Sequence, residues 1–194
     1  MKKSILASVV LSLTIVTACS PTQVPKRDTA LPAEATNVPS GWKEYKSNSA
    51  NFAFALPPGW VLGAGDLDGE AAQFGGPAEK GLTFNVLVGL SEGYSLSQYL
   101  EQVDLSRSTA WEGSPSVDVL GSRDTTLDGQ IAVLRKEFLT AAGFAALATY
   151  AIKNDTVYTF TMHFQGISSE QAALPAEDVA LYEQILGTIV LGEK

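Results

Sequence analysis

The side chains that most often carry catalysis are scarce in this sequence of 194 residues. There is one cysteine, Cys19, and one histidine, His163. A serine hydrolase needs a base beside its nucleophile, and the chain contains no G-x-S-x-G elbow. A zinc site takes three or four histidine, cysteine or carboxylate ligands, so a single histidine leaves carboxylates to supply the rest. The sequence therefore predicts no catalytic site, no metal site and no cofactor.

His163 lies in a stretch that alternates like a β-strand, from Thr156 to Phe164. It is in register with Thr159 and Thr161, and the larger apolar side chains fall on the opposite face. We expect an ordinary histidine on the face of a sheet. The alternative is a role in a site.

An acidic cluster, Asp66, Asp68 and Glu70, offers the oxygen ligands that Ca²⁺ prefers. It does not follow the EF-hand spacing, because with Gly69 as the turn glycine the bidentate acid would fall at Gly75. The pattern favours a solvated loop. A weak cation site, or one that a partner completes, is the alternative.

Two glycine-rich stretches lack the residues that hold a phosphate. Gly63-Ala64-Gly65 is followed by acids, which repel phosphate, and residues 76–81 lead into Leu82 rather than into Lys-Ser or Lys-Thr. The tryptophans are the remaining candidates for a binding surface: Trp42, Trp60 and Trp111. Because two stand at strand or turn ends and one at a helix end, we expect packing in the core or at its rim.

The N-terminus has the pattern of a secretory leader. Lys2 and Lys3 form a positive segment, and residues 5–16 are apolar apart from three hydroxyl side chains. About a dozen residues are too few for a helix that spans a bilayer, which takes about 20. The next four residues, Val16-Thr17-Ala18-Cys19, resemble a lipobox, the motif at which bacterial lipoproteins are lipidated and cut. The resemblance implies that residues 1–18 are a signal peptide and that Cys19 carries the lipid, with palmitate-type acyl chains.

Lipidation of Cys19 would use up the only thiol, because the thioether to diacylglycerol forms on sulfur. Two or three acyl chains anchor a protein stably in a membrane. Ser20, in place of an aspartate, resembles the outer-membrane sorting pattern of cells with two membranes. With one membrane, the chain is expected on the outer face of the cell membrane. The alternative is an ordinary secretory leader, which leaves Cys19 as a free thiol.

Charge and cysteine content exclude further classes of function and structure. The leader holds two lysines and no acids, so the chain from Cys19 onward carries 11 basic and 21 acidic side chains, a formal net charge of −10. A nucleic-acid surface needs clustered Lys and Arg, and the adjacent basic pairs, Lys26-Arg27 and Arg135-Lys136, are isolated. One cysteine allows no disulfide within the chain. The fold must be held by its core.

Composition divides the exported chain into a tether and one domain. Residues 19–40 contain the lipidated cysteine, four prolines and no aromatic residue, which is typical of a flexible tether. Residues 41–194, roughly 150 in number, have the usual size of a single domain with one core.

The first half of this domain is expected to open with a hairpin. The segments 42–46 and 51–56 flank a polar turn, and apolar residues alternate in the second, as in a half-buried strand. The glycine- and acid-rich stretch 63–81 predicts loops around a short strand, Ala71–Phe74. Leu82–Leu90 is apolar on both faces, which indicates a central strand.

The second half combines helices with a run of strands. Ser95 and Gln98 have capping-box spacing, and an apolar stripe predicts a helix from Ser95 to about Trp111. A meander follows: Val117–Leu120, Ile131–Leu139, Phe144–Lys153 and Thr156–Phe164. Pro175 then begins an amphipathic helix with acids in its first turn. The architecture is therefore α+β, an antiparallel β-sheet with amphipathic helices packed on it.

This order of elements resembles the PsbP-like α/β/α sandwich. The segment that carries the resemblance alternates aromatic residues and then has prolines, a turn and a tryptophan: Phe52-Ala53-Phe54-Ala55-Leu56-Pro57-Pro58-Gly59-Trp60. The likeness extends over about residues 42–191. Proteins of this group are mostly accessory or interaction proteins, so the resemblance implies such a role here and no enzyme activity. It assigns no functional residue to this chain.

Two classes of function follow. The leading one is a membrane-anchored lipoprotein of the cell envelope that acts as a non-catalytic interaction or assembly module for a protein partner, without nucleic acid. The alternative is a solute- or cation-binding lipoprotein with a pocket near the acidic loop 63–81. A hydrolase that uses carboxylates alone is a more distant third.

Overall fold

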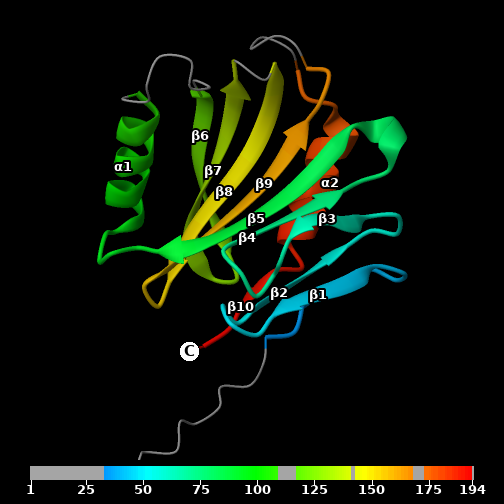
Figure 1. Cartoon of the computed structure of the whole chain (residues 1–194), viewed down its shortest axis with the longest axis horizontal. Coiled ribbons are helices and arrows are strands. Elements are labelled where there is room, and N and C mark those ends of the chain that lie inside the picture. Colours follow the sequence, from blue (N-terminus) through cyan, green and yellow to red (C-terminus); the bar gives the residue numbers. More distant parts are fainter. Residues whose placement is uncertain (1–32, 109–116, 141–142, 168–172, 194) are drawn as a thin grey trace, which may run out of the picture.

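The computed structural model describes residues 33–108, 117–140, 143–167 and 173–193 (Figure 1). The leader, Cys19 and most of the predicted tether lie outside these residues, and so does Trp111. No helix within the described ranges is long and apolar enough to cross a membrane. The described residues form two antiparallel sheets and two α-helices. The predicted α+β class is confirmed.

The larger sheet has seven strands in the order β3-β4-β5-β9-β8-β7-β6, and the smaller sheet has the order β1-β2-β10. The strands of the larger sheet are β3 (Val61–Gly65), β4 (Ala71–Gly75), β5 (Leu82–Leu90), β6 (Val117–Leu127), β7 (Gln130–Leu139), β8 (Phe144–Lys153) and β9 (Thr156–Phe164). Those of the smaller sheet are β1 (Lys43–Ser47), β2 (Phe52–Leu56) and β10 (Val190–Leu191). The helices are α1 (Leu96–Ser108), α2 (Ala176–Leu186) and the short 3-10 helix η1 (Ala78–Lys80).

The predicted meander is confirmed as β6 to β9, and β5 joins it through β9. Asp128 and Gly129 both have positive φ at the β6–β7 turn, as do Asn154 and Asp155 at the β8–β9 turn. This is the backbone that two-residue hairpins require. β6 runs to Leu127, seven residues beyond the predicted end, because its second half continues the ladder with β7.

The opening hairpin is also confirmed, with β1 and β2 paired from Lys43↔Leu56 to Ser47↔Phe52. The half-buried character expected of β2 is wrong, since all five of its residues are buried. β2 is the central strand of its sheet. Its backbone also hydrogen-bonds to the C-terminal segment, where the Ala55 N–H donates to Thr188 Oγ1 at 2.9 Å.

The loop predicted for residues 63–65 is wrong as well, because they complete β3. Gly65 has a φ of +77°, and a Cβ there would come within 2.2 Å of the Ala71 carbonyl oxygen. The glycines that indicated a loop are therefore strand residues held close to β4. The strand Ala71–Phe74 is confirmed and gains one residue.

The two helices lie on opposite faces of the seven-stranded sheet (Figure 1). The capping box of α1 forms as predicted: the Ser95 N–H donates to Gln98 Oε1 at 3.0 Å, and the Gln98 N–H donates to Ser95 Oγ at 3.4 Å. α2 begins after Pro175, and its Tyr182 and Ile185 are buried. The Tyr182 hydroxyl donates to the Phe160 carbonyl at 2.7 Å, which fixes α2 on the sheet.

The main core lies between the smaller sheet, α2 and the inner face of the larger sheet. Phe54 of β2 is its centre, with ring centroids 5.6 Å from Phe74 and 5.5 Å from Phe84. Trp60, directly after the proline break, is 5% exposed and belongs to this core. The expected packing role of Trp60 is confirmed, and Trp42 packs at the rim.

Residues 33–36, at the end of the predicted tether, contact the domain. The Ala33 N–H donates to Asn51 Oδ1 at 2.9 Å, and the Thr36 N–H donates to the Thr188 carbonyl at 3.1 Å. The chain thus enters the domain beside the smaller sheet.

Candidate functional site

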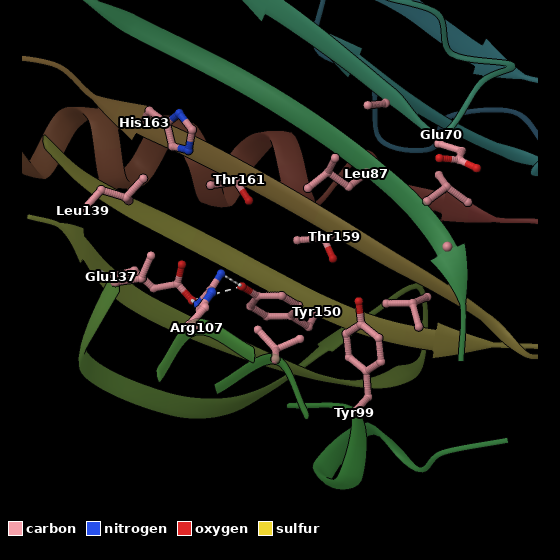
Figure 2. Close-up of a pocket in the computed structure, with 16 residues that line it drawn as sticks. Glu70, Leu87, Tyr99, Arg107, Glu137, Leu139, Tyr150, Thr159, Thr161 and His163 are labelled. Carbon is pink, nitrogen blue, oxygen red and sulfur yellow. Dashed lines mark hydrogen bonds and ion pairs between the residues drawn. The ribbon is translucent and has the colours of Figure 1, made fainter. Parts of the chain in front are cut away.

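A groove of about 440 Å³ lies between α1 and the outer face of the larger sheet, the face turned away from the main core (Figure 2). It exists because α1 covers only part of that face: Leu100 packs on Ala148 and Tyr150 of β8, and β9 and β5 continue past the helix. The residues that line it come from α1, from six strands and from the end of the acidic loop: Glu70, Ala71, Leu87, Val88, Gly89, Tyr99, Val103, Arg107, Val117, Glu137, Leu139, Tyr150, Val157, Thr159, Thr161 and His163.

A buried ionic cluster closes one side of the groove (Figure 2). Arg107 of α1 donates to Glu137 Oε1 at 2.9 Å and to the Tyr150 hydroxyl at 3.2 Å. Tyr150 in turn donates to the same carboxylate oxygen at 3.0 Å. Burial, reinforced by the negative charge of Glu137, raises the pKa of Tyr150, so the phenol stays protonated and remains a donor.

A second ion pair holds α1 from the same strand. Arg135 of β7 donates to both carboxylate oxygens of Asp104, at 2.6 and 3.1 Å, and its guanidinium lies 5.8 Å from the centre of the Tyr150 ring. Bidentate pairs of this kind fix orientation as well as contact. The two ion pairs and the Leu100 contact therefore set the distance between α1 and the sheet.

Several polar groups on the groove surface have no hydrogen-bond partner among the described residues, including two threonine hydroxyls and one carboxylate oxygen. Thr159 and Thr161 are 7% and 8% exposed, and their hydroxyls face the groove. The Glu137 side chain is 4% exposed, and both of its bonds use Oε1, which leaves Oε2 without a donor. These are the groups that a bound molecule would meet.

His163 lies at one end of the groove, in register with the two threonines, as the alternation predicted. The Asn85 amide nitrogen is 3.1 Å from His163 Nδ1. Because an amide nitrogen only donates, Nδ1 accepts this bond and Nε2 carries the proton. Burial lowers the pKa of His163, although the charge of Glu137 opposes the shift. The ring is therefore neutral at pH 7 and presents an N–H donor.

The acidic cluster serves the local fold. Asp68 Oδ1 accepts hydrogen bonds from the N–H groups of Asn48 and Ser49, at 2.6 and 3.1 Å, and so caps the turn between β1 and β2. Asp66 Oδ1 accepts from the Asp68 N–H at 3.0 Å. Within the described part of the chain, no group of three or more His, Cys, Asp or Glu side chains is arranged to hold a metal ion. Only Glu70 of this cluster reaches the groove.

The outer edge of β3 is a second candidate surface. All five residues of β3 are exposed, and the strand, Val61-Leu62-Gly63-Ala64-Gly65, carries no charge. β4 pairs with one side of it, and no described strand pairs with the other. An unpaired edge of this kind presents free backbone N–H and C=O groups.

The ionic cluster of the groove was not predicted from the sequence. A signal was present: three charges in a row, Arg135, Lys136 and Glu137, interrupt the apolar strand β7, and alternation puts Arg135 and Glu137 on the same face. Charges in the middle of an apolar strand are rarely buried unless they are paired. That pattern indicates partners on another element, although it does not say which.

Known proteins resemble this chain in their fold. No family model matches the chain, and no curated protein matches it. Among solved structures, the chain is similar to cyanobacterial PsbP (CyanoP) from Synechocystis sp. PCC 6803, with 12% identity and a TM-score of 0.55 over 80% of this chain and 95% of that one. It is also similar to the Saccharomyces cerevisiae Ran-binding protein Mog1p, with 14% identity and a TM-score of 0.51 over 77% of this chain and 95% of that one. The chain has the fold that PsbP and Mog1p share.

Proposed function

We propose that this chain is a membrane-tethered, non-catalytic module that binds a protein partner in the bacterial cell envelope. The lipobox at Cys19 supports the tether and the location. One protein of the same fold is by name a Ran-binding protein, which supports an interaction role for the fold. The sequence supports the non-catalytic part, because it holds one histidine, one cysteine and no G-x-S-x-G elbow.

The observation that carries the proposal is the open edge of β3. Natural sheets protect their edges with charges, prolines or strong bulges, and an edge without them pairs readily with another extended chain. Between Leu62 and Ala64 the β3–β4 register shifts by one residue, yet the strand has no charged side chain and no proline. We infer that an extended segment of the partner adds to the sheet beside β3.

The other edge of the same sheet provides a contrast. Both edge strands have a register shift, but β6 also carries three charged side chains, Asp118, Arg123 and Asp124. Charges on an edge strand hinder its pairing with another chain. This difference in charge supports β3, rather than β6, as the docking site.

The negative charge beside β3 indicates that the partner segment has basic side chains next to the part that pairs with the strand. Asp66, Asp68 and Glu70 follow β3 directly, and none forms an ion pair with a described residue. With a net charge of −10 from Cys19 onward, the domain repels an acidic partner. The expected segment is therefore uncharged where it pairs with β3 and basic beside the acidic loop.

Crosslinking and pull-down from envelope membranes with the full-length lipidated chain tests the proposal. The variant Leu62→Lys places a charge on the β3 edge, and the matched control Val119→Lys places one on β6. The two positions are similarly exposed, 48% for Leu62 and 42% for Val119. We expect a stoichiometric partner with the wild type and with Val119→Lys, and a loss of most of it with Leu62→Lys. Absence of any stoichiometric partner, or equal recovery with all three proteins, would refute the proposal.

A further inference from the structure

We propose that the groove beneath α1 binds an uncharged amphipathic small molecule, an apolar chain or ring that carries hydroxyl groups. This site is separate from the β3 edge, and the inference does not depend on the proposed protein partner. The inference makes the alternative function, a solute-binding lipoprotein, specific, because it names the site and the chemical class of the ligand. The groove volume of about 440 Å³ is within the usual range of small-molecule sites.

The floor of the groove has a row of unused hydrogen-bonding groups. Thr159, Thr161 and His163 alternate along β9, so consecutive side chains stand roughly 6.7 Å apart on one face. Both threonine residues are more than nine-tenths buried, and their hydroxyls open onto the groove without a partner among the described residues. A valine has the same shape without the hydroxyl and would serve equally well if this face only packed against apolar side chains. Two threonines at such positions therefore indicate a molecule that hydrogen-bonds to them.

The other polar groups complete a set of donors and acceptors. Glu137 Oε2 has no donor among the described residues, and His163 Nε2 carries a proton because Nδ1 accepts from Asn85. A threonine hydroxyl can both donate and accept. A ligand hydroxyl, which also does both, satisfies any of these groups without a change of protonation.

The walls of the groove require that the rest of the ligand be apolar. Tyr99 of α1 faces the floor from one side, and Leu87 of β5 lies across from it (Figure 2). Val103 of α1 also lines the groove. Leu139 closes the end next to His163. Burying a hydrocarbon between these side chains supplies most of the binding free energy, and the polar floor sets its orientation.

The charges in the groove disfavour an anion most, because two carboxylates and one guanidinium line it, and a free cation less strongly. Arg107 is already paired with Glu137 at 2.9 Å, so the cluster is neutral as a whole. An anionic ligand would meet Glu137 and, at the rim, Glu70, whereas a cationic ligand would meet Arg107. An uncharged ligand avoids both repulsions and leaves the ion pair intact.

Three probes that share one alkyl chain separate these cases: 1-octanol, octanoate and octylammonium. Each is titrated calorimetrically into the chain from Cys19 to Lys194, produced without its leader and therefore without lipid. We expect saturable binding of 1-octanol and at least tenfold weaker binding of both ions. Tighter binding of either ion, or no binding of any probe, overturns the inference.

The variant Thr159→Val/Thr161→Val locates the site. We expect it to bind 1-octanol roughly tenfold more weakly, the equivalent of the one hydrogen bond that the octanol hydroxyl makes to either threonine, and to melt no lower than the wild type. Thr126→Val, which removes an exposed hydroxyl from β6 outside the groove, is the control and should bind like the wild type. Equal affinity of the double variant and the wild type overturns the inference, whatever the pull-down on β3 shows.

Discussion

Asp68 shows at the scale of single residues how an acid that suggests a ligand site can belong to the fold. Its carboxylate accepts two backbone N–H bonds from the turn between β1 and β2 and a third bond from the Ser47 hydroxyl, and the Ser49 hydroxyl donates to the Asp68 backbone carbonyl. The N–H groups of Ser49 and Asn48 lower the pKa of Asp68 below its ordinary value of 3.8. The charge on Asp68 therefore stabilises the hairpin.

Replacing Asp68 with alanine is expected to lower the free energy of unfolding by about 1 kcal/mol at pH 7, because charge-assisted bonds to an exposed turn are lost. Since the pKa of Asp68 is lower in the folded protein, its contribution is full above about pH 4 and disappears as the pH falls through the folded pKa. Urea unfolding at a series of pH values measures this.

Glu79→Ala is the matched control, because Glu79 is an exposed acid of η1. The stability difference between wild type and Asp68→Ala should shrink below pH 4, and the Glu79→Ala difference should stay near zero throughout. A constant Asp68→Ala difference down to pH 2 would show that the charge has no part in the effect.

At the scale of elements, the sequence predicted most strands and both helices, because alternation, caps and turn pairs are local signals. The loop predicted for β3 was wrong because the prediction rested on its glycines. Gly65 is a strand residue that has to be glycine, because the Ala71 carbonyl lies too close for a Cβ, and a contact of this kind cannot be inferred from the sequence. The groove was also not predicted. The alternation of Thr159 and Thr161 indicated a polar face of β9. The position of α1 above that face could not be predicted, because it depends on Arg107 and Glu137, which are 30 residues apart in sequence.

The Arg107–Glu137 pair should be the strongest polar link between α1 and the sheet. Arg107→Met leaves Glu137 buried with Tyr150 as its remaining donor, so we expect a loss of about 2 kcal/mol, less than for a fully buried pair because the Arg107 side chain is 27% exposed. Denaturant unfolding measures the loss.

The double variant Arg107→Met/Glu137→Gln removes the charge that Arg107→Met leaves behind, so it should be more stable than Arg107→Met alone. Arg123→Met is the control: its pair with Glu183 is exposed on both sides and should contribute less than about 0.5 kcal/mol. If the stability loss of the double variant equals the sum of the losses of Arg107→Met and Glu137→Gln measured separately, the two side chains are not a coupled buried pair.

At the scale of the whole molecule, the anchor and the domain should be separable. Cys19→Ser removes the sulfur on which the proposed lipid is built, so we expect the chain to leave the membrane fraction while its thermal unfolding transition stays the same. Sedimentation of membranes after a carbonate wash, followed by detection of the chain, measures this.

Thr22→Ala, a neighbouring change that leaves the lipobox intact, should remain with the membranes. Continued sedimentation of Cys19→Ser would mean that Cys19 is not the anchor.

The contacts of residues 33–36 determine where mechanical load from the N-terminal side enters the domain. Asn51 holds both sides of this entry, because its Oδ1 accepts from the Ala33 N–H and its carbonyl accepts from the Gly192 N–H at 2.7 Å. A pull on the chain therefore strains the smaller sheet first, through the turn after β1 and the C-terminal strand. The groove lies on the opposite face of the larger sheet, so a load that enters through residues 33–36 does not act directly on α1 or its ion pairs.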